Sequence, residues 1–312
     1  MSGARTAGPL RPVPNLYRPG RAIGGGPKRL DRLSDSQEDR PYELFDLVPY
    51  GPLIGAEIRG VDLRRPIGAQ LRAELHRAFL EWKVLFFRGQ ELTDAQHLRF
   101  ARLWGPLECN PFLPTGAQPD IVRFAKNDSV RGVENTWHAD VTWRERPALG
   151  AVLRVTQVPP LGGDTLWADA AAAYDNLPDS VRARLDGLTA VHDFGPSIGA
   201  FMAPDVLSDW QRRYPAVEHP VVRTHPETGR RTLFVNATYT TEIVGLLTDE
   251  SEELLQYLFR QLHLPEYQVR LRWKPHTVAF WDNRATQHYA VSDYYPHRRT
   301  GERAAIEGDR PC

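Results

Sequence analysis

The sequence has little cysteine and no surplus of charge of either sign. Cys109 and Cys312 are the only cysteines among 312 residues, too few for a disulfide framework or a thiolate metal cluster. Lys plus Arg and Asp plus Glu both number 39, so the formal net charge is zero, which argues against a broad nucleic-acid or membrane surface. The chain lacks an apolar run of membrane-spanning length, and its N-terminus lacks a signal-peptide core. We therefore expect a cytoplasmic protein that binds a small molecule, but neither nucleic acid nor a membrane.

The first 40 residues differ in composition from the rest. They are rich in Pro, Gly and Arg, and no acidic residue precedes Asp31. Because such a segment buries too little apolar surface to offset its ordering entropy, we expect residues 1–40 to form a flexible N-terminal arm. The alternatives are a nucleic-acid-binding tail, or an arm that covers the site or wraps a neighbouring subunit in a homodimer or homotetramer. Residues 41–312 are predicted to form a single domain, with eight tryptophans for its core.

The residue pattern predicts many short strands and a few helices. Apolar residues at helical spacing, a capping box at Thr93 and Gln96, and Pro178 at a helix start are the helix signals. They predict helices over 69–82, 93–105, 169–175, 178–186 and 248–262. Alternating or fully apolar runs predict strands over 84–87, 119–125, 148–158, 164–168, 267–273, 276–282 and 298–307, with a hairpin of 221–223 and 232–235. This mixture indicates an α+β, mainly β fold, with a sandwich or barrel core decorated by helices.

One segment shows no clear period. Residues 194–219 are therefore predicted to be a long loop, of the length that often serves as a lid or a binding segment.

Three residues form a candidate metal site. His138 and Asp140 are two positions apart, so on an extended segment both side chains point to the same side. His288 offers a third ligand from the far end of the chain. Two imidazoles and one carboxylate leave three octahedral positions open, as in non-haem Fe(II) oxygenases. A single histidine is more often structural than a ligand, so the prediction depends on all three residues together.

Several motifs carry a resemblance to a known family. They are Trp137-His138-Ala139-Asp140-Val141-Thr142-Trp143, Gly162-Gly163-Asp164-Thr165-Leu166-Trp167, Trp281-Asp282-Asn283-Arg284-Ala285-Thr286-Gln287-His288, Val84-Leu85-Phe86-Phe87-Arg88-Gly89-Gln90, and Arg299 with Arg303. In this order and spacing, residues 50–311 resemble the taurine dioxygenase/2,4-D dioxygenase (TauD/TfdA-like) family of Fe(II)/2-oxoglutarate-dependent dioxygenases. The resemblance implies a double-stranded β-helix (jelly-roll) core with inserted and flanking helices.

The resemblance also implies cofactors and an activity. Fe(II) would be held by His138, Asp140 and His288. The cosubstrate 2-oxoglutarate would chelate the iron, and its distal carboxylate would bind Arg299 and Thr165, because a guanidinium matches a carboxylate at two points. With O2 as second cosubstrate, the products would be succinate, CO2 and a hydroxylated substrate, which breaks apart when the new hydroxyl lies beside a heteroatom. A halogenase of this chemistry lacks the carboxylate ligand, so Asp140 favours hydroxylation.

The substrate pocket is less well defined by the sequence. Arg303 lies four residues after Arg299 and therefore on the same face of a strand. In taurine-type relatives the matching arginine binds the anionic group of the substrate. The alternative is that Arg303 pairs with a structural acid. Asn110, Glu134 and Val141 are further substrate-binding candidates, and Asn110 and Glu134 depart from the taurine pattern. Glu134 with Arg303 would suit a zwitterion, unless Glu134 is simply solvated.

Three functions follow from these residues. The first is a dioxygenase that acts on a small anionic or zwitterionic substrate, such as an amino acid or a natural-product intermediate. The second is an alkylsulfatase or sulfonate dioxygenase that scavenges sulfur. The third, from another class, is a non-catalytic jelly-roll protein that binds a metal or ligand. Five other histidines are interpreted as surface or helix-face residues, namely His76, His97, His219, His263 and His297.

Overall fold

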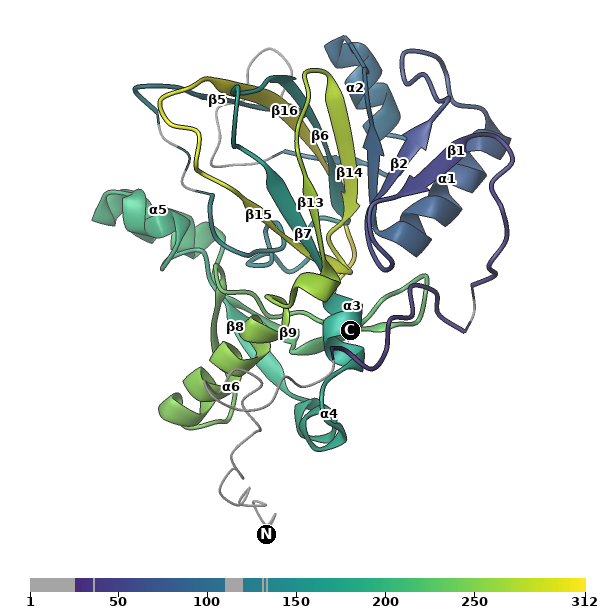
Figure 1. Ribbon diagram of the computed structural model, residues 1–312. Helices are drawn as coiled ribbons and strands as arrows, with labels where there is room; N and C mark the ends of the chain where they lie inside the picture. The colour runs from purple at the N-terminus through teal and green to yellow at the C-terminus, as the bar shows by residue number, and fades with distance from the viewer. Residues whose placement is uncertain (1–25, 36, 110–119, 131, 133) are drawn as a thin grey trace.

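The computed structural model describes residues 26–35, 37–109, 120–130, 132 and 134–312. Two facing β-sheets form its centre (Figure 1). The larger sheet has the order β1-β2-β3-β14-β6-β16-β4, and β5 pairs with β16. Its strands are β1 Asp46–Pro49, β2 Ala56–Arg59, β3 Val84–Phe87, β4 Leu107–Glu108, β5 Val122–Lys126, β6 Gly150–Gln157, β14 Thr277–Asp282 and β16 Arg299–Ile306. The smaller sheet, of order β13-β7-β15, consists of β7 Thr165–Asp169, β13 Gln268–Leu271 and β15 Thr286–Ala290.

The space between the two sheets is filled by apolar side chains. Trp167 of β7 and Trp281 of β14 contribute the largest of them, with ring centroids 5.9 Å apart. Each tryptophan is almost fully buried, which removes roughly 150–250 Å² of aromatic surface from water. The mainly β fold with a jelly-roll core is confirmed.

Helices cover the outer face of the larger sheet. They are α1 Ala69–Trp82 and α2 Asp94–Ala101, and Thr93 caps α2 through the predicted capping box with Gln96. Phe79 of α1 stacks on Phe280 of β14 at 4.0 Å between ring centroids. Because both of its faces are covered, every residue of β14 is buried, which explains why its central residues 278–281 are all apolar rather than alternating.

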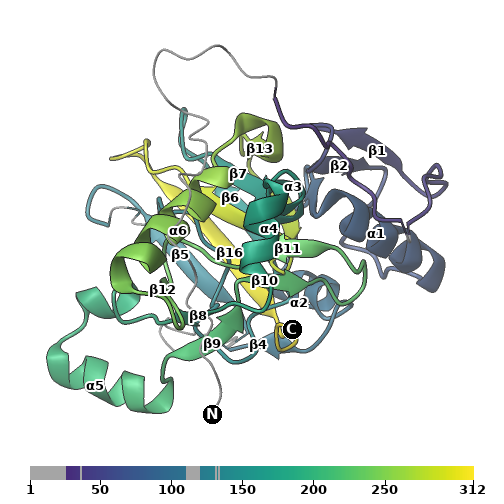
Figure 2. The ribbon, with the colours of Figure 1, turned by 90° about the horizontal axis from the view of Figure 1, so that it is seen from below.

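An insert between β7 and β13 lies below the two sheets in Figure 1. It contains a three-stranded sheet of order β12-β8-β9, which Figure 2 shows beside α6, and the hairpin β10-β11. Its elements are α3 Ala170–Asp175, α4 Asp179–Leu185, β8 Thr189–His192, η1 Ile198–Phe201, α5 Pro204–Arg213, β9 Val217–Pro220, β10 Val222–Thr224, β11 Arg231–Leu233, β12 Thr240–Ile243 and α6 Thr248–Gln261, followed by η2 Pro265–Tyr267.

The predicted loop over 194–219 is wrong. This segment contains η1, helix α5 and strand β9. Figure 1 shows α5 projecting from the body of the protein, and none of its residues is buried. Helix α5 does carry apolar residues at helical spacing, Leu207 and Trp210, which pack partly buried against the cluster around Trp143. The prediction overlooked this short stripe because most other residues of the segment are polar or charged. The sequence pattern also missed β1, β2, β4, β8, β12 and β15.

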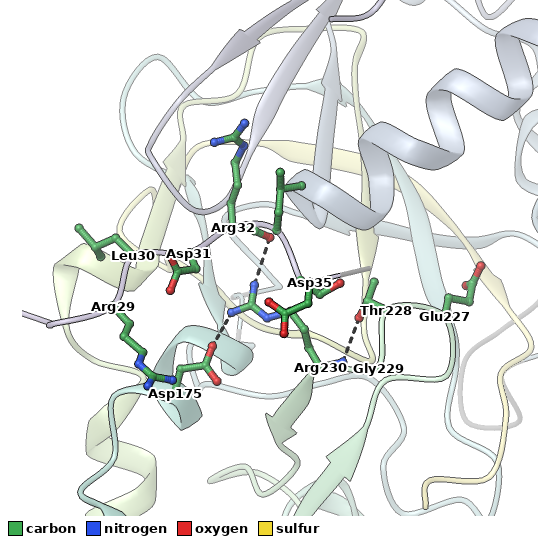
Figure 3. A pocket seen from close by; sticks show the side chains of 12 residues that line it. Arg29, Leu30, Asp31, Arg32, Asp35, Asp175, Glu227, Thr228, Gly229 and Arg230 are labelled. Atoms are coloured by element: carbon green, nitrogen blue, oxygen red, sulfur yellow. Dashed lines mark hydrogen bonds and ion pairs between the residues drawn. The ribbon is translucent and has the colours of Figure 1, made fainter. Parts of the chain in front are cut away.

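Part of the predicted arm lies against the domain. The backbone of Arg29 exchanges two hydrogen bonds with the Asn176 side chain, at 2.9 and 2.8 Å. Figure 3 shows Arg230 donating to the Arg32 carbonyl and to Asp175, beside an open cavity of about 880 Å³. The boundary near residue 40 stays a prediction. Among the described residues, no helix combines the length and the apolar composition needed to cross a membrane.

Candidate functional site

The structure brings His138, Asp140 and His288 together. A potential ligand atom of each residue lies within 4.8 Å of the others. The Nε2 atoms of both histidines are 3.9 Å from Oδ1 of Asp140. The two histidines face each other across an antiparallel bridge, with backbone N–H···O contacts of 3.0 and 2.7 Å. This bridge joins residues 150 positions apart in the chain, which explains how His288 reaches the His-x-Asp motif.

Hydrogen bonds orient these ligands. Nδ1 of His138 lies 2.8 Å from the Thr136 carbonyl, so Nδ1 carries the proton and Nε2 is left as the ligand atom. The side chain of Asn283 holds the backbone of Asp140 at both ends: Oδ1 accepts from the Asp140 N–H and Nδ2 donates to its carbonyl, each at 3.0 Å. Asn283 is therefore a supporting residue for the carboxylate.

The chemistry of this donor set fits a divalent cation. Burial opposes ionisation of Asp140, but Arg303 and the two histidines lower its pKa to about 2. Burial, aided by His138, lowers the pKa of His288 to about 3. The site thus presents an ionised carboxylate and a neutral imidazole, the forms that bind metals. Oδ2 of Asp140 is buried and has no hydrogen-bond partner in the described part of the chain, so it is available for ligation.

The backbone of Val141 is strained. Its φ angle is 50°, in the left-handed region that a β-branched residue rarely adopts, at a cost of about 1–3 kcal/mol. Its side chain is buried in a small apolar cluster with Trp143 and Tyr239. Val141 was a predicted substrate contact, and it lies next to the metal ligand Asp140; a contact with substrate stays a prediction.

Thr165 and Arg299 meet across the two sheets. Nη2 of Arg299, on β16, lies 3.5 Å from Oγ1 of Thr165, on β7. Nε1 of Trp273 donates to the same hydroxyl at 2.9 Å. Arg299 is buried and lies over the rings of Phe124 and Trp273, and burial lowers its pKa. Since a buried guanidinium is stable only beside an anion, and no carboxylate of the described residues forms an ion pair with it, this position is suited to the carboxylate of a ligand.

Arg303 lies beside the predicted metal ligands. Its Nη1 atom is 2.5 Å from Oδ1 of Asp140. Glu108 on β4 pairs with Ala305 and is thus two positions from Arg303 across the strands, while its carboxylate binds Arg144. Two ion pairs, Arg144 with Glu108 and Arg303 with Asp140, therefore lie at this end of the site. The sequence left open whether Arg303 pairs with a structural acid. Arg303 does pair with an acid, but this acid is Asp140, the predicted metal ligand.

The other substrate candidates lie differently. Oε1 of Glu134 accepts from Nζ of Lys126 at 2.7 Å, and about half of the Glu134 side chain (49%) is exposed, so its charge is already balanced. Asn110 lies outside the described residues. No pattern in the sequence indicated Tyr239, whose buried ring lies edge-on to His138 at 6.3 Å between centroids. Burial, with the nearby Asp140 carboxylate, raises the pKa of this phenol.

Two of the remaining histidines differ from the prediction. His219 is buried rather than at the surface, with Nε2 2.9 Å from the Arg144 carbonyl. His97 lies on helix α2 as expected, but it faces the sheet and is fully buried, with Nε2 2.9 Å from the Val152 carbonyl.

Comparison with known proteins identifies relatives over most of the chain. The family model described as taurine catabolism dioxygenase TauD, TfdA family, matches residues 45–305. An alkylsulfatase from Acinetobacter baylyi is 36% identical, covering 86% of this chain and 87% of the relative. An alpha-ketoglutarate-dependent sulfate ester dioxygenase from Pseudomonas putida is 38% identical, covering 87% of this chain and 92% of the relative. The crystal structure of a taurine dioxygenase from Burkholderia xenovorans has a TM-score of 0.75 at 37% identity, covering 86% of this chain and 91% of that one.

Proposed function

We propose, from the premise that this chain belongs to the TauD, TfdA family and is a 2-oxoglutarate-dependent dioxygenase, that His138, Asp140 and His288 hold Fe(II). Because the chain belongs to an enzyme family, the hypothesis of a non-catalytic binding protein is dropped. The observation that carries the proposal is the convergence of the three ligand atoms within 4.8 Å, with the buried Oδ2 of Asp140 free of hydrogen bonds to described residues. Two imidazoles and one carboxylate are the ligands that Fe(II) oxygenases use.

The second part of the proposal concerns the cosubstrate. Arg299 and Thr165 would bind the distal carboxylate of 2-oxoglutarate, Arg299 through its guanidinium and Thr165 through its hydroxyl. Trp273 donates to Thr165 Oγ1, which leaves the hydroxyl proton of Thr165 to point at the ligand. When bound, Fe(II) with 2-oxoglutarate and O2 supplies the oxidising power that converts a C–H bond of the substrate into C–OH, with release of succinate and CO2.

The third part concerns the substrate. Arg303 is the cation closest to the ligand set, so it would orient the anionic group of a small molecule and hold the reacting carbon over the metal. Among the anions that suit a guanidinium, a sulfate ester is favoured by the two relatives named as an alkylsulfatase and a sulfate ester dioxygenase. A zwitterion is less favoured because the Glu134 carboxylate already binds Lys126.

The reaction with an alkyl sulfate balances without a further reactant. Insertion of one oxygen atom at the carbon that bears the sulfate oxygen gives a hydroxylated ester. Its C–O bond to sulfate then breaks as the hydroxyl loses its proton, which yields an aldehyde and inorganic sulfate. The second atom of O2 enters succinate as 2-oxoglutarate loses CO2. Arg303 would stabilise the sulfate both as part of the substrate and as the leaving anion.

The experiment compares substrates that differ only in the anionic group. Hexyl sulfate, hexanesulfonate, hexanoate and an amino acid of similar length are each incubated with the protein, Fe(II), 2-oxoglutarate and O2. We expect succinate formation matched by one sulfate per hexyl sulfate, and slower turnover of the others. Turnover of hexanesulfonate with sulfite release, at a higher kcat/KM than that of hexyl sulfate, would support the sulfonate alternative. Preference for the amino acid would support the zwitterion alternative, and either result would overturn the sulfate assignment.

A further inference from the structure

We propose that Thr142, His192 and Asn236 form a positioning cluster that holds the Asp140 loop in its metal-binding geometry. The loop in question is residues 136–144, which contains two of the three ligands. The inference rests on the proposed metal site, and it assigns to the insert a part in building that site. None of the three cluster residues contacts a metal ligand through its side chain; they act through the backbone of the loop.

The buried hydroxyl of Thr142 makes hydrogen bonds with two side chains of the insert. Its hydroxyl oxygen lies 2.9 Å from Nδ1 of His192 and 2.9 Å from Nδ2 of Asn236. All three side chains are at most 1% exposed. The amide of Asn236 donates to Thr142, and burial lowers the pKa of His192 so that its neutral ring shares one hydrogen bond with the same hydroxyl. Each polar atom of this contact is thus satisfied by another member of the cluster.

The cluster lies immediately beside the strained residue of the loop. Val141, with its φ of 50°, separates Asp140 from Thr142. On one side of Val141, Asn283 holds the backbone of Asp140 with two hydrogen bonds. On the other side, the cluster holds Thr142. A strained conformation persists only where its surroundings fix it, so these two sets of contacts are what keep Asp140 turned toward the histidines.

The anchoring groups come from the insert, which holds the loop at more than one point. His192 ends β8, and Asn236 begins the turn before β12, where its Oδ1 accepts from the N–H groups of Thr238 and Tyr239. Thr238 in turn donates to the Trp137 carbonyl at 3.2 Å. His219 on β9 lies 2.9 Å from the Arg144 carbonyl. The small sheet β12-β8-β9 and its turn therefore support both ends of the loop.

The test uses metal binding and does not depend on turnover. Mn(II), a redox-stable divalent ion, is titrated calorimetrically into the full-length protein without 2-oxoglutarate. Thr142→Val keeps the shape of the side chain but removes the hydroxyl, and we expect the Kd for Mn(II) to rise about tenfold or more. Thr142→Ser keeps the hydroxyl and should restore a Kd close to that of wild type.

A matched control separates positioning from stability. Thr277 is as buried as Thr142, and its hydroxyl accepts from Nη1 of Arg88 at 3.0 Å, at the start of β14 and away from the ligands. Thr277→Val should lower the Tm without changing the Kd for Mn(II). If Thr142→Val binds Mn(II) as tightly as wild type, the cluster is structural only and the inference is wrong, whereas failure of wild type itself to bind Mn(II) would contradict the proposed metal site.

The contact can also be tested from its partner. If Thr142→Val does not fold, His192→Leu removes the ring nitrogen that contacts the Thr142 hydroxyl and leaves the sequence of the loop intact. A weaker Kd for Mn(II) in folded His192→Leu supports the inference, and an unchanged Kd overturns it.

Discussion

Nη1 of Arg303 lies 2.5 Å from Oδ1 of Asp140, so the proposed substrate-binding cation and a proposed metal ligand are in direct contact. Burial opposes the charge of Arg303, but the Asp140 carboxylate and, less strongly, the Glu108 carboxylate, two positions away across the strands, raise its pKa above the ordinary value. The anionic group of a substrate bound to Arg303 would therefore lie close to the metal. This short distance limits the reacting carbon to one near the anion, which is where a sulfate ester would be cleaved.

The first prediction concerns Arg303. Arg303→Lys keeps the charge but loses the planar pair of donors, so kcat/KM for hexyl sulfate should fall by about 10- to 150-fold, the equivalent of a charged hydrogen bond of 1.5–3 kcal/mol. The Kd for 2-oxoglutarate should not change. Arg298→Gln is the control, because Arg298 is exposed and adjacent to the same strand. Equal effects of both variants would show that Arg303 has no special part in substrate binding.

The second prediction concerns the cosubstrate. Arg299→Gln removes the buried cation, so the Kd for 2-oxoglutarate should rise about 100-fold, whereas Thr165→Val, which removes one neutral donor, should raise it by about tenfold. Anaerobic titration of the metal-loaded protein with 2-oxoglutarate measures both values. Because Arg299 and Thr165 are both buried, the Tm of each variant is measured alongside. A Kd unchanged in Arg299→Gln would contradict the assignment of this arginine.

Some of the site could be predicted from the sequence, and the reason is local geometry. The spacing of His138 and Asp140 predicted that both side chains share one side of an extended segment. The structure pairs only His138 in a β-bridge and places Asp140 at the turn that follows, yet the two side chains do meet. Thr165 and Arg299 were found only through a resemblance, because they lie on different sheets and no local pattern joins residues 134 positions apart. Similarly, Glu108 reaches Arg303 only through the pairing of β4 with β16.

The insert was the least predictable part. Helix α5 has an apolar stripe, Leu207 and Trp210, but the stripe is short and none of the residues of the helix is buried completely, so the sequence pattern predicts a loop. Outside the insert, strand β15 was also missed, because it is short and carries polar residues, among them His288. Tyr239 and Asn236 lie on a turn whose place beside the ligands is decided by packing of the whole insert. The positions of these residues therefore depend on how the whole chain packs, and a local sequence pattern does not show them.

The third prediction concerns Glu134. Since its carboxylate is half exposed and already bound to Lys126, Glu134→Gln should leave kcat/KM for hexyl sulfate nearly unchanged. The same variant should lose activity only on a substrate that carries an amine, if such a substrate is turned over. Initial rates on hexyl sulfate and on an amino acid measure both effects. A large loss on hexyl sulfate would indicate that Glu134 contributes to the pocket in another way.

The fourth prediction concerns stability at low pH. A hydrogen bond from His76, with the Arg284 guanidinium, lowers the pKa of Glu227 from 4.5 to about 2, although burial opposes this. Because the fold favours the ionised form, its contribution is complete above pH 4.5 and is lost as the pH falls toward 2. Allowing for solvent around a side chain one third (33%) exposed, we expect about 1–2 kcal/mol at neutral pH.

Urea unfolding of wild type and Glu227→Gln between pH 7 and pH 3 measures this contribution. The difference in unfolding free energy should be constant above pH 4.5 and should shrink below it. Glu253→Gln, at an exposed position of α6, should show no difference at any pH. A difference for Glu227→Gln that stays constant down to pH 3 would mean that its origin is packing rather than charge.

The account depends most on the assignment of Fe(II) and 2-oxoglutarate to the three converging ligands. The direct measurement is the anaerobic absorption spectrum on addition of Fe(II) and then 2-oxoglutarate, for wild type and for His288→Ala. We predict a weak visible charge-transfer band in wild type and none in the variant, with both proteins folded. A wild-type protein that binds iron but gives no band with 2-oxoglutarate, or a band that persists in His288→Ala, would contradict the central claim.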